Sequence, residues 1–318
     1  MGNIKIIRGV FDTKLELEHA GIAAGFPSPA DDYRHETLDF NRDYIRHPEA
    51  SFYDDKKSIC TSRSFIKTNE TNMQQGKKAI VIGASSGIGL EVAKLLVDQG
   101  WTVGVAARRT ELLQGNGAAA IERIDVTTDD ATEGLQRLIS KLGGMDLFFY
   151  ASGIGKQNRE LTEDIELATV QTNGMGFTRM IGEAYRYFFK QGNGHIAAIT
   201  SIAGTKGLGP APSYSATKAM QNVYLQALEQ QARSRKLNIR FTDVRPGFVD
   251  TALLSGDFHY PMMLKPEKVA QEIVYAINHH KHIRVIDWKY RILTAVWRRI
   301  PRWIWRRLTL TPHFHYSS

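Results

Sequence analysis

Short runs of apolar residues alternate with longer, mixed segments between residues 78 and 247. The runs are rich in valine, isoleucine, alanine and phenylalanine, and several end at a glycine. Runs of this length and composition are typical of strands buried within a parallel sheet. The pattern predicts six strands, at residues 78–84, 101–108, 118–126, 145–153, 194–204 and 237–247.

The segments between the predicted strands repeat their apolar residues at helical spacing. In residues 86–100, Ile88, Val92 and Leu96 lie on one face, and Gly100 closes the segment. Strands that alternate with helices form a parallel sheet covered on both faces. We therefore predict an α/β fold, a doubly wound parallel sheet of the Rossmann type. Its helices are expected at residues 86–100, around 131–142, near 162–190 and at 213–236.

The same pattern divides the chain into three parts. Residues 1–76 lack it, and the stretch from residue 54 onward is polar and typical of a linker. We expect this N-terminal extension to be poorly ordered. Residues 77–284 form the single main domain, and residues 285–318 form a basic, amphipathic C-terminal tail.

The formal net charge of +8 comes almost entirely from that tail. Residues 288–308 hold seven lysines and arginines and no acidic residue, so the remaining chain is nearly balanced. This balance argues against general binding of nucleic acid. The only cysteine, Cys60, excludes a disulfide framework and a thiolate metal cluster and favours the cytoplasm. We see no secretory signal and no apolar run of about 18 residues, so we expect no spanning helix and no metal.

A glycine-rich turn joins the first predicted strand to the first predicted helix. Gly83, Gly87 and Gly89 lie on it, in the sequence GASSGIG. A turn without side chains lets the backbone approach a pyrophosphate, and the helix N-terminus offers N–H groups to the anion. The position at a strand-to-helix junction predicts a dinucleotide site. The alternative is a glycine turn that only permits tight packing.

The end of the second strand indicates which dinucleotide binds. A carboxylate there favours NAD, whereas an arginine accommodates the 2′-phosphate of NADP. Here Arg108 and Arg109 follow the strand, and no acid does. We predict NADP(H), with Arg108 as the phosphate contact, Arg109 as its support and Asp125-Val126 beside the adenine. The alternative is two solvated arginines at the start of a helix.

A tyrosine and a lysine are four residues apart in the predicted helix 213–236. Tyr214 and Lys218 therefore share one helix face, and an ammonium group nearby lowers the pKa of a phenol toward neutrality. Tyr53 and Lys57 have the same spacing, but they lie in a stretch with no helical pattern. We interpret that second pair as a chance match.

Five motifs together resemble the short-chain dehydrogenase/reductase family over about residues 77–280. Ser201 lies thirteen residues before Tyr214, and the motifs follow one another on the expected elements. The resemblance implies an oxidoreductase and a homodimer or homotetramer. The motifs are GASSGIG (83–89), Asn173-x2-Gly176, Ser201, Tyr214-x3-Lys218 and Pro246-Gly247.

The resemblance also implies the roles of single residues. Tyr214 exchanges a proton with the substrate oxygen while NADPH delivers hydride, Lys218 binds the nicotinamide ribose, and Ser201 holds the substrate oxygen. Asn173 kinks its helix and seats a water in a proton relay to Lys218. The implied cofactor contacts are Gly83, Ser85, Ser86, Gly87, Ile88, Gly89, Arg108, Arg109, Asp125, Val126, Gly153, Tyr214, Lys218, Pro246, Gly247, Val249 and Thr251.

Two segments need a separate interpretation. Where the family usually has Asn-Asn-Ala-Gly after the fourth strand, this chain has Tyr150-Ala151-Ser152-Gly153, and Ile82 replaces a usual threonine. The segment 252–264 corresponds to the family's substrate lid. It is apolar, which indicates a hydrophobic substrate unless these side chains pack on the sheet edge.

The C-terminal tail has the composition of a membrane-surface helix. Four of the five tryptophans lie in residues 288–308, among arginines and isoleucines, and Pro301 is expected to kink the helix. The alternative is a tail docked on its own domain or on a partner subunit. A peripheral location at the inner membrane face follows from the first interpretation.

Residues 24–53 resemble the N-terminal region of self-cleaving mutagenesis proteins of the SOS response, relatives of LexA-type peptidases. Ala24-Gly25 matches the cleavage point of that family. The match stops after Tyr53, which leaves no place for the Ser–Lys dyad, so we predict no peptidase activity. The segment suggests a bacterial origin.

These observations favour an NADP-dependent oxidoreductase that interconverts a small or lipid-like ketone or aldehyde with an alcohol. An alternative hypothesis from a different functional class is a catalytically silent NADP-binding sensor or scaffold. The presence of Ser201, Tyr214 and Lys218 together argues against it. A third hypothesis makes the N-terminal segment a subunit of DNA-damage machinery, which the near-neutral body and the missing dyad oppose.

Overall fold

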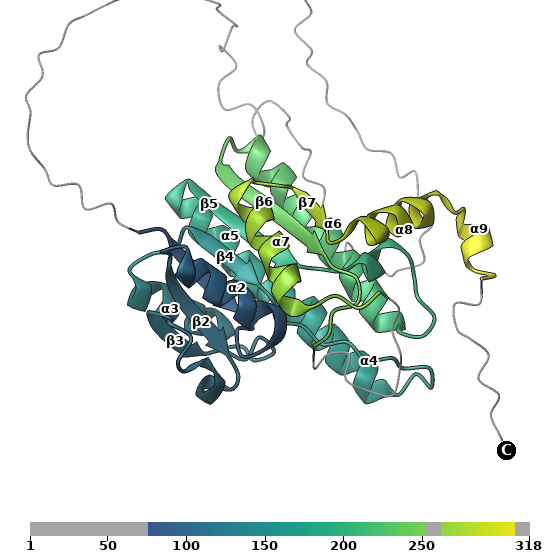
Figure 1. Ribbon diagram of the computed structural model, residues 1–318, viewed down its shortest axis with the longest axis horizontal. Helices are drawn as coiled ribbons and strands as arrows, with labels where there is room; N and C mark the ends of the chain where they lie inside the picture. The colour runs from purple at the N-terminus through teal and green to yellow at the C-terminus, as the bar shows by residue number, and fades with distance from the viewer. Residues whose placement is uncertain (1–75, 252–261, 309–318) are drawn as a thin grey trace, which may run out of the picture. The chain divides into compact units, whose positions relative to one another are not determined.

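The computed structural model describes residues 76–251 and 262–308 (Figure 1). The predictions for residues 1–75 lie outside the described residues, and these include the peptidase-like segment and the pair Tyr53 and Lys57. The greater part of the lid, residues 252–261, lies outside them as well.

The described residues fold around a seven-stranded sheet in which every neighbouring pair of strands is parallel. The strand order is β3-β2-β1-β4-β5-β6-β7. Winding changes direction between β1 and β4, and ligands of open α/β sheets bind at such a switch point. The strands are β1 (Lys78–Ile82), β2 (Thr102–Ala107), β3 (Ala120–Arg123), β4 (Leu147–Tyr150), β5 (Asn193–Ile199), β6 (Asn238–Arg245) and β7 (Ile283–Val285).

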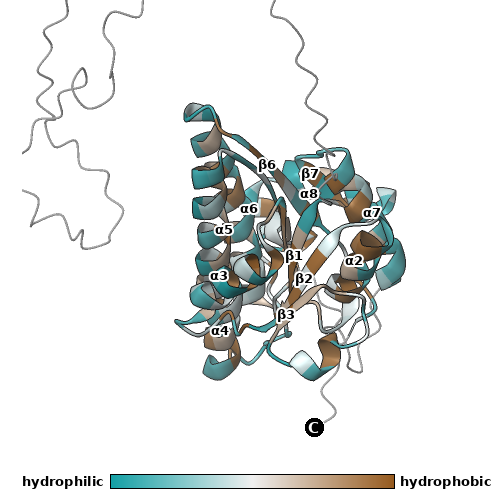
Figure 2. Cartoon of the chain, turned by 90° about the vertical axis from the view of Figure 1, so that its left-hand side faces the viewer, coloured by the Kyte–Doolittle hydropathy of each residue, from teal (hydrophilic) through white to brown (hydrophobic). Residues whose placement is uncertain are grey.

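Helices cover both faces of the sheet, as predicted (Figure 2). One face packs against α3 (Ala131–Leu142), α5 (Phe177–Gln191) and α6 (Pro212–Ser234), and the other against α2 (Gly87–Asp98) and α7 (Pro266–Asn278). Strand β1 shows why: Ile80 and Ile82 belong to the first core, whereas Ala79 and Val81 belong to the second. Alternate residues of one strand point to opposite faces, so both faces are apolar.

Two elements near the end of the domain were missed by the pattern analysis. Helix α7 carries the helical repeat Val269, Ile273, Val274 and Ile277, all buried. This repeat begins just after the lid and is readable in the sequence. Strand β7 has only three residues, which is too short for a recognisable alternation. It extends the sheet one residue beyond the predicted domain boundary at residue 284.

The predicted helix near 162–190 is not continuous. It begins as α4 (Glu163–Thr169), widens into a π-helical segment at Val170–Gly176 and continues as α5. The segment contains Asn173, which is fully buried. Single π-helical turns inside α-helices are frequent at functional sites.

The C-terminal tail is docked on the domain by one face. Helix α8 (Trp288–Arg299) ends before Pro301, and the short helix α9 (Arg302–Trp305) follows. The indole Nε1 of Trp305 donates to the carbonyl of Gly207 over 2.7 Å, and the Lys206 amine donates to the carbonyl of Ile300 over 2.9 Å. Within the described ranges, no helix combines the length and the apolar character that a membrane crossing requires.

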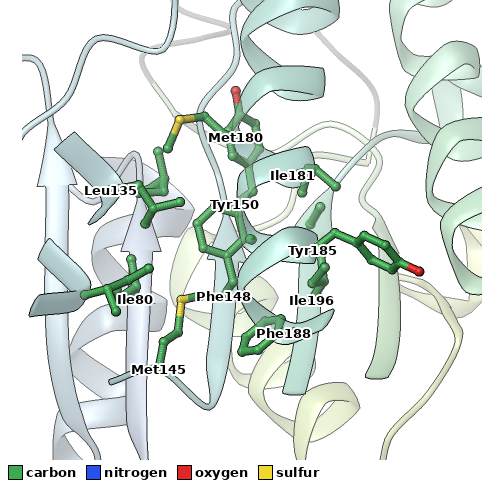
Figure 3. Packing of buried hydrophobic residues seen from close by; sticks show 14 of the residues in the cluster. Ile80, Leu135, Met145, Phe148, Tyr150, Met180, Ile181, Tyr185, Phe188 and Ile196 are labelled. Atoms are coloured by element: carbon green, nitrogen blue, oxygen red, sulfur yellow. The ribbon is translucent and has the colours of Figure 1, made fainter. Parts of the chain in front are cut away.

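Tyr150, the departure at the end of β4, is a core residue rather than a site residue. Its ring lies against Phe177 at 5.3 Å between ring centres, among apolar side chains such as Leu135 and Ile181 (Figure 3). Burial raises the pKa of its hydroxyl. That hydroxyl is buried and has no hydrogen-bond partner in the described part of the chain.

Replacing Tyr150 by phenylalanine should stabilise the protein. The change removes a buried hydroxyl that lacks a hydrogen bond, so the free energy of unfolding should rise by about 1 kcal/mol. The matched control is Tyr290→Phe, because the equally buried Tyr290 hydroxyl accepts from the Phe248 amide and donates to the Met262 carbonyl. The control should lose about 1 kcal/mol. Urea unfolding measures both, and a loss in Tyr150→Phe would contradict this account.

Candidate active site

A cavity of about 1040 Å³ lies at the carboxyl ends of the strands. The turns after β1, β2, β4, β5 and β6 all contribute to its wall. This volume reaches the top of the usual range for ligand pockets, so there is room for a large ligand and a second, smaller one. The cavity lies at the switch point between β1 and β4.

The turn between β1 and α2 forms a tight backbone cradle on the cavity wall. Gly83 has a φ of +88°, and a Cβ there would come within 2.7 Å of the Ser152 amide. A Cβ on Gly89 would come within 2.2 Å of the Gly83 carbonyl oxygen. Neither position therefore tolerates a side chain.

The N-terminus of α2 fits an anion. Ser86 precedes the helix without capping it through its side chain, and the first turn contains no acidic residue. The first N–H groups of a helix lack partners within it and carry partial positive charge. The cradle and this terminus together fit the pyrophosphate of a dinucleotide. Ser85, Ser86, Gly87, Ile88 and Gly89 all line the cavity.

The far end of the cavity is lined by the predicted adenosine contacts. Arg108 and Arg109 follow β2 and are exposed. Asp125 and Val126 come just after β3 rather than inside it. Burial acts to raise the pKa of the Asp125 carboxyl, but the hydrogen bonds from Thr127 and the charge of Arg108 outweigh it and lower that pKa. The structure brings these residues to one place.

Ser201, Tyr214 and Lys218 meet on the opposite wall. Ser201 lies in the turn after β5, and the other two lie in the first turns of α6. The Ser201 hydroxyl lies close enough to the Tyr214 hydroxyl to influence its pKa. The Lys218 amine is 5.7 Å from the centre of the Tyr214 ring.

Burial shifts the pKa of both ionisable groups. It raises the pKa of the Tyr214 hydroxyl, and the neighbouring Ser201 hydroxyl acts to lower that pKa. It lowers the pKa of Lys218 to about 8, against the attraction of Asp243. The expected lowering of the tyrosine pKa by Lys218 is therefore not the main effect in the protein itself. Lys218 stays mostly protonated at neutral pH.

Gln221 holds Lys218 in place and was missed by the sequence analysis. Its amide oxygen accepts from the Lys218 amine over 3.0 Å, and its amide nitrogen donates to the Asn173 carbonyl over 2.8 Å. Gln221 is fully buried. A polar residue three positions after Lys218, on the same helix face, was the available signal.

Asn173 is the one predicted catalytic residue that does not line the cavity. Its side-chain amide donates to the Ile154 carbonyl over 2.6 Å and accepts from the Ile154 amide over 2.9 Å. It therefore ties the turn after β4 to the π-helical segment. Its own carbonyl accepts from Gln221, so a side chain bridges Asn173 and Lys218 where the resemblance implies a water.

Gly153 and Gly155 allow a close approach between the turn after β4 and the residues of the site. A Cβ on Gly155 would come within 2.7 Å of the Tyr214 ring, and one on Gly153 within 3.3 Å of the Asn173 amide oxygen. Gly155 was not among the predicted residues. Its place in the turn after a buried strand was the only signal.

The turn after β6 closes the floor of the cavity. Pro246, Gly247, Val249 and Thr251, the cofactor contacts expected from this turn, all line it. The Gly247 backbone packs against the ring of Tyr290, which a Cβ would overlap at 2.2 Å. The tail thus supports this turn directly.

The part of the cavity wall near Tyr214 is largely apolar. Met262 is the described lid residue in this wall. The tail contributes two further side chains, which the sequence analysis assigned to a membrane or docking face. Apolar lining residues of the cavity include Ile202, Leu208, Phe248, Met262, Leu293 and Trp297.

The chain is similar to known proteins over this domain. The family model described as short chain dehydrogenase matches residues 77–259. An uncharacterized oxidoreductase of Staphylococcus saprophyticus is 32% identical over 225 residues, which cover 66% of this chain and 95% of that protein. An uncharacterized oxidoreductase of Staphylococcus epidermidis is 29% identical over 218 residues, which cover 66% of this chain and 94% of that protein.

Solved structures share the fold. An actinorhodin polyketide ketoreductase solved with NADPH has a TM-score of 0.60 at 24% identity, covering 67% of this chain and 97% of that one. A short chain dehydrogenase from Burkholderia cenocepacia in complex with NADP has a TM-score of 0.65 at 21% identity. The match covers 74% of this chain and 98% of that one. At these identities, the likeness shows the architecture alone.

The buried amine of Lys218 should make stability depend on pH. Its pKa is about 8 in the folded protein and 10.5 when unperturbed. Between these values the folded state has released the proton while the unfolded state keeps it, so stability rises with pH. Relative to Lys218→Met, the wild-type free energy of unfolding should rise by about 1.4 kcal/mol per pH unit from pH 8 to 10.

Urea unfolding of the full chain across this pH range measures the effect. The control is Lys190→Met, because Lys190 is exposed and its removal should leave the pH profile of the wild type. Parallel profiles for the wild type and Lys218→Met would contradict the buried-amine account.

Proposed function

The chain belongs to the short-chain dehydrogenase family and is an oxidoreductase of that family, and we propose that it interconverts a hydrophobic ketone or aldehyde with the alcohol, using NADP(H). One observation carries this proposal. The pair Tyr214 and Lys218, with Ser201, lies on the wall of the same cavity as the glycine cradle. A tyrosine that could transfer a proton and a turn that could hold a dinucleotide thus border the same cavity.

In the proposed mechanism, the substrate oxygen lies between the hydroxyls of Ser201 and Tyr214. Bound NADPH would supply the hydride for reduction. Tyr214 gives its proton to the substrate oxygen, and Ser201 donates a hydrogen bond to that oxygen. The positive charge of Lys218 stabilises the phenolate that remains. The reverse reaction uses Tyr214 as the base.

The residues of the cavity fit the cofactor. Gly83, Gly87 and Gly89 and the first N–H groups of α2 would hold the pyrophosphate, and Arg108 with Arg109 would hold the 2′-phosphate. Asp125 and Val126 would border the adenine. The nicotinamide half would contact Ser85, Ser86, Ile88, Gly153, Lys218, Pro246, Gly247, Val249 and Thr251.

Asn173 is proposed as a positioning residue. It fixes the turn after β4 through Ile154 and reaches Lys218 only through Gln221. A glutamine amide does not ionise, so this bridge orients the lysine and does not carry its proton.

We further propose that the enzyme is a homodimer or homotetramer that works in the cytoplasm on a small carbonyl compound. Exposed apolar side chains on the adjacent helices α4 and α6, together with the π-helical segment, support self-association. They are Leu167, Val170, Met175, Met220 and Val223. The catalytic domain is proposed to span residues 77–284, with residues 1–76 and 285–318 as extensions.

The proposed reaction is tested with purified full chain, NADPH and a panel of ketones and aldehydes. Tyr214→Phe should lower kcat/KM for reduction by about 100-fold or more, because it removes the proton donor. NADPH binding, followed by its fluorescence, should stay within twofold. The exposed Tyr275 gives the control variant Tyr275→Phe, which should keep full activity. Full activity of Tyr214→Phe would overturn the mechanism, and tight NADPH binding without any turnover would favour the sensor.

Cofactor choice should depend on Arg108. Arg108→Ala should raise the Kd for NADPH by about tenfold or more, since it removes a charge-assisted contact with the 2′-phosphate. The Kd for NADH should change by less than twofold. Arg233→Ala, at an exposed arginine of α6, is the control for the loss of a positive charge. An equal loss of affinity for both nucleotides would refute the role given to Arg108.

A further inference from the structure

The tail presents two different faces, and the inner one belongs to the catalytic domain. Tyr290 and Thr294 are buried on it, and Leu293 and Trp297 line the cavity. Trp305 extends this face after Pro301 and packs edge-on against Trp297 at 5.4 Å between ring centres. Docking on the domain therefore uses one face of the tail.

The outer face of the tail is apolar and exposed. Trp288, Ile292 and Val296 follow one another at four-residue spacing on α8, and their exposed fractions are 58%, 57% and 53%. Trp303, on α9, is 63% exposed. Folding thus leaves in solvent a row of large apolar side chains that the domain does not need for its core.

Basic side chains surround this row. Lys289, Arg291, Arg298, Arg299, Arg302, Arg306 and Arg307 are all exposed, and residues 288–308 contain no acidic residue. The cations of Lys289 and Arg307 lie over the rings of Trp288 and Trp303, at 6.0 and 5.6 Å from the ring centres. Tryptophan with flanking cations is the combination that stabilises a helix at the headgroup level of a bilayer.

We propose that this outer face, defined by Trp288, Ile292, Val296 and Trp303, docks on a bilayer with anionic headgroups. Charge decides between this surface and a second copy of the chain. A symmetric contact between two tails would place the seven positive side chains of residues 288–308 against the same seven of the second copy. No acidic side chain of this segment would offset their repulsion. An anionic lipid surface complements the same charges.

This docking would place the cavity directly beneath the lipid surface. Leu293 and Trp297 form part of the cavity wall on the helix whose other side carries the lipid contact. Resting on the proposed function, the inference names the substrate class: a carbonyl compound that partitions into lipid. The apolar wall near Tyr214 suits such a compound.

The test is co-sedimentation of the full chain with vesicles of two parts phosphatidylcholine to one part phosphatidylglycerol. The triple variant Ile292→Ser, Val296→Ser, Trp303→Ser should bind at least about tenfold more weakly than the wild type. The matched control, Leu112→Ser, Leu161→Ser, Ile283→Ser, removes three exposed apolar residues from outside the tail and should bind like the wild type. Vesicles of phosphatidylcholine alone should bind the wild type weakly.

A charge variant separates the two parts of the contact. Arg298→Gln, Arg302→Gln, Arg306→Gln should weaken binding to the mixed vesicles and reduce its dependence on salt. Equal binding by the triple serine variant and its control, or no binding of the wild type to mixed vesicles, would overturn the proposal. The proposal would also be overturned if gel filtration shows a dimer for the wild type and not for the serine variant, while both bind vesicles equally.

Turnover keeps this inference apart from the proposed function. Reduction of a long-chain ketone carried in mixed vesicles should be several-fold faster for the wild type than for the serine variant, whereas a water-soluble ketone should be reduced equally by both. Turnover without vesicle binding would contradict the docking proposal and leave the proposed function standing. Vesicle binding without turnover on any substrate would contradict the proposed function and leave the docking proposal standing.

Discussion

The burial of the Lys218 amine is the constraint on which the rest of the site depends. An ammonium group removed from water is stable only where carbonyls, amides and an opposite charge replace its hydration. Here the Ile199 carbonyl and the Gln221 amide bind it directly, and Asp243 adds a negative charge nearby. These partners come from β5, α6 and β6, so the amine fixes the position of these two strands relative to α6.

The π-helical segment extends this constraint to the turn after β4. Its widened turn frees Asn173 to use two groups at once: the side chain binds both backbone groups of Ile154, and the carbonyl accepts from Gln221. The turn after β4 is thereby connected to Lys218 through three successive hydrogen-bonded residues. Tyr150 and Ala151 do not hold the turn after β4 in place, because Tyr150 points into the core. The hydrogen bonds of Asn173 hold it instead.

Most of the fold and of the site wall could be predicted because the signals are local. Six strands, the glycine turn and the Tyr214-Lys218 pair each occupy one short stretch of sequence. The spacing of the residues within each stretch indicates its local structure. Gln221 and Gly155 could not be assigned in this way, since their importance comes from partners 48 and 59 residues away. The roles of Leu293 and Trp297 were hidden for the same reason: amphipathic spacing shows that a helix has an apolar face, not which surface covers it.

The tail has apolar residues on both sides, and under the docking proposal each side has its own contact. A helix that only docked on its domain would gain nothing from Trp288, Ile292 and Val296, and large exposed apolar groups are costly for solubility. A helix that only bound lipid would not need Tyr290, whose ring supports Gly247 beneath the cavity. With both sets present, contact at the outer face and the shape of the cavity are properties of the same rigid element. Where the enzyme sits and what its cavity accepts are therefore physically linked.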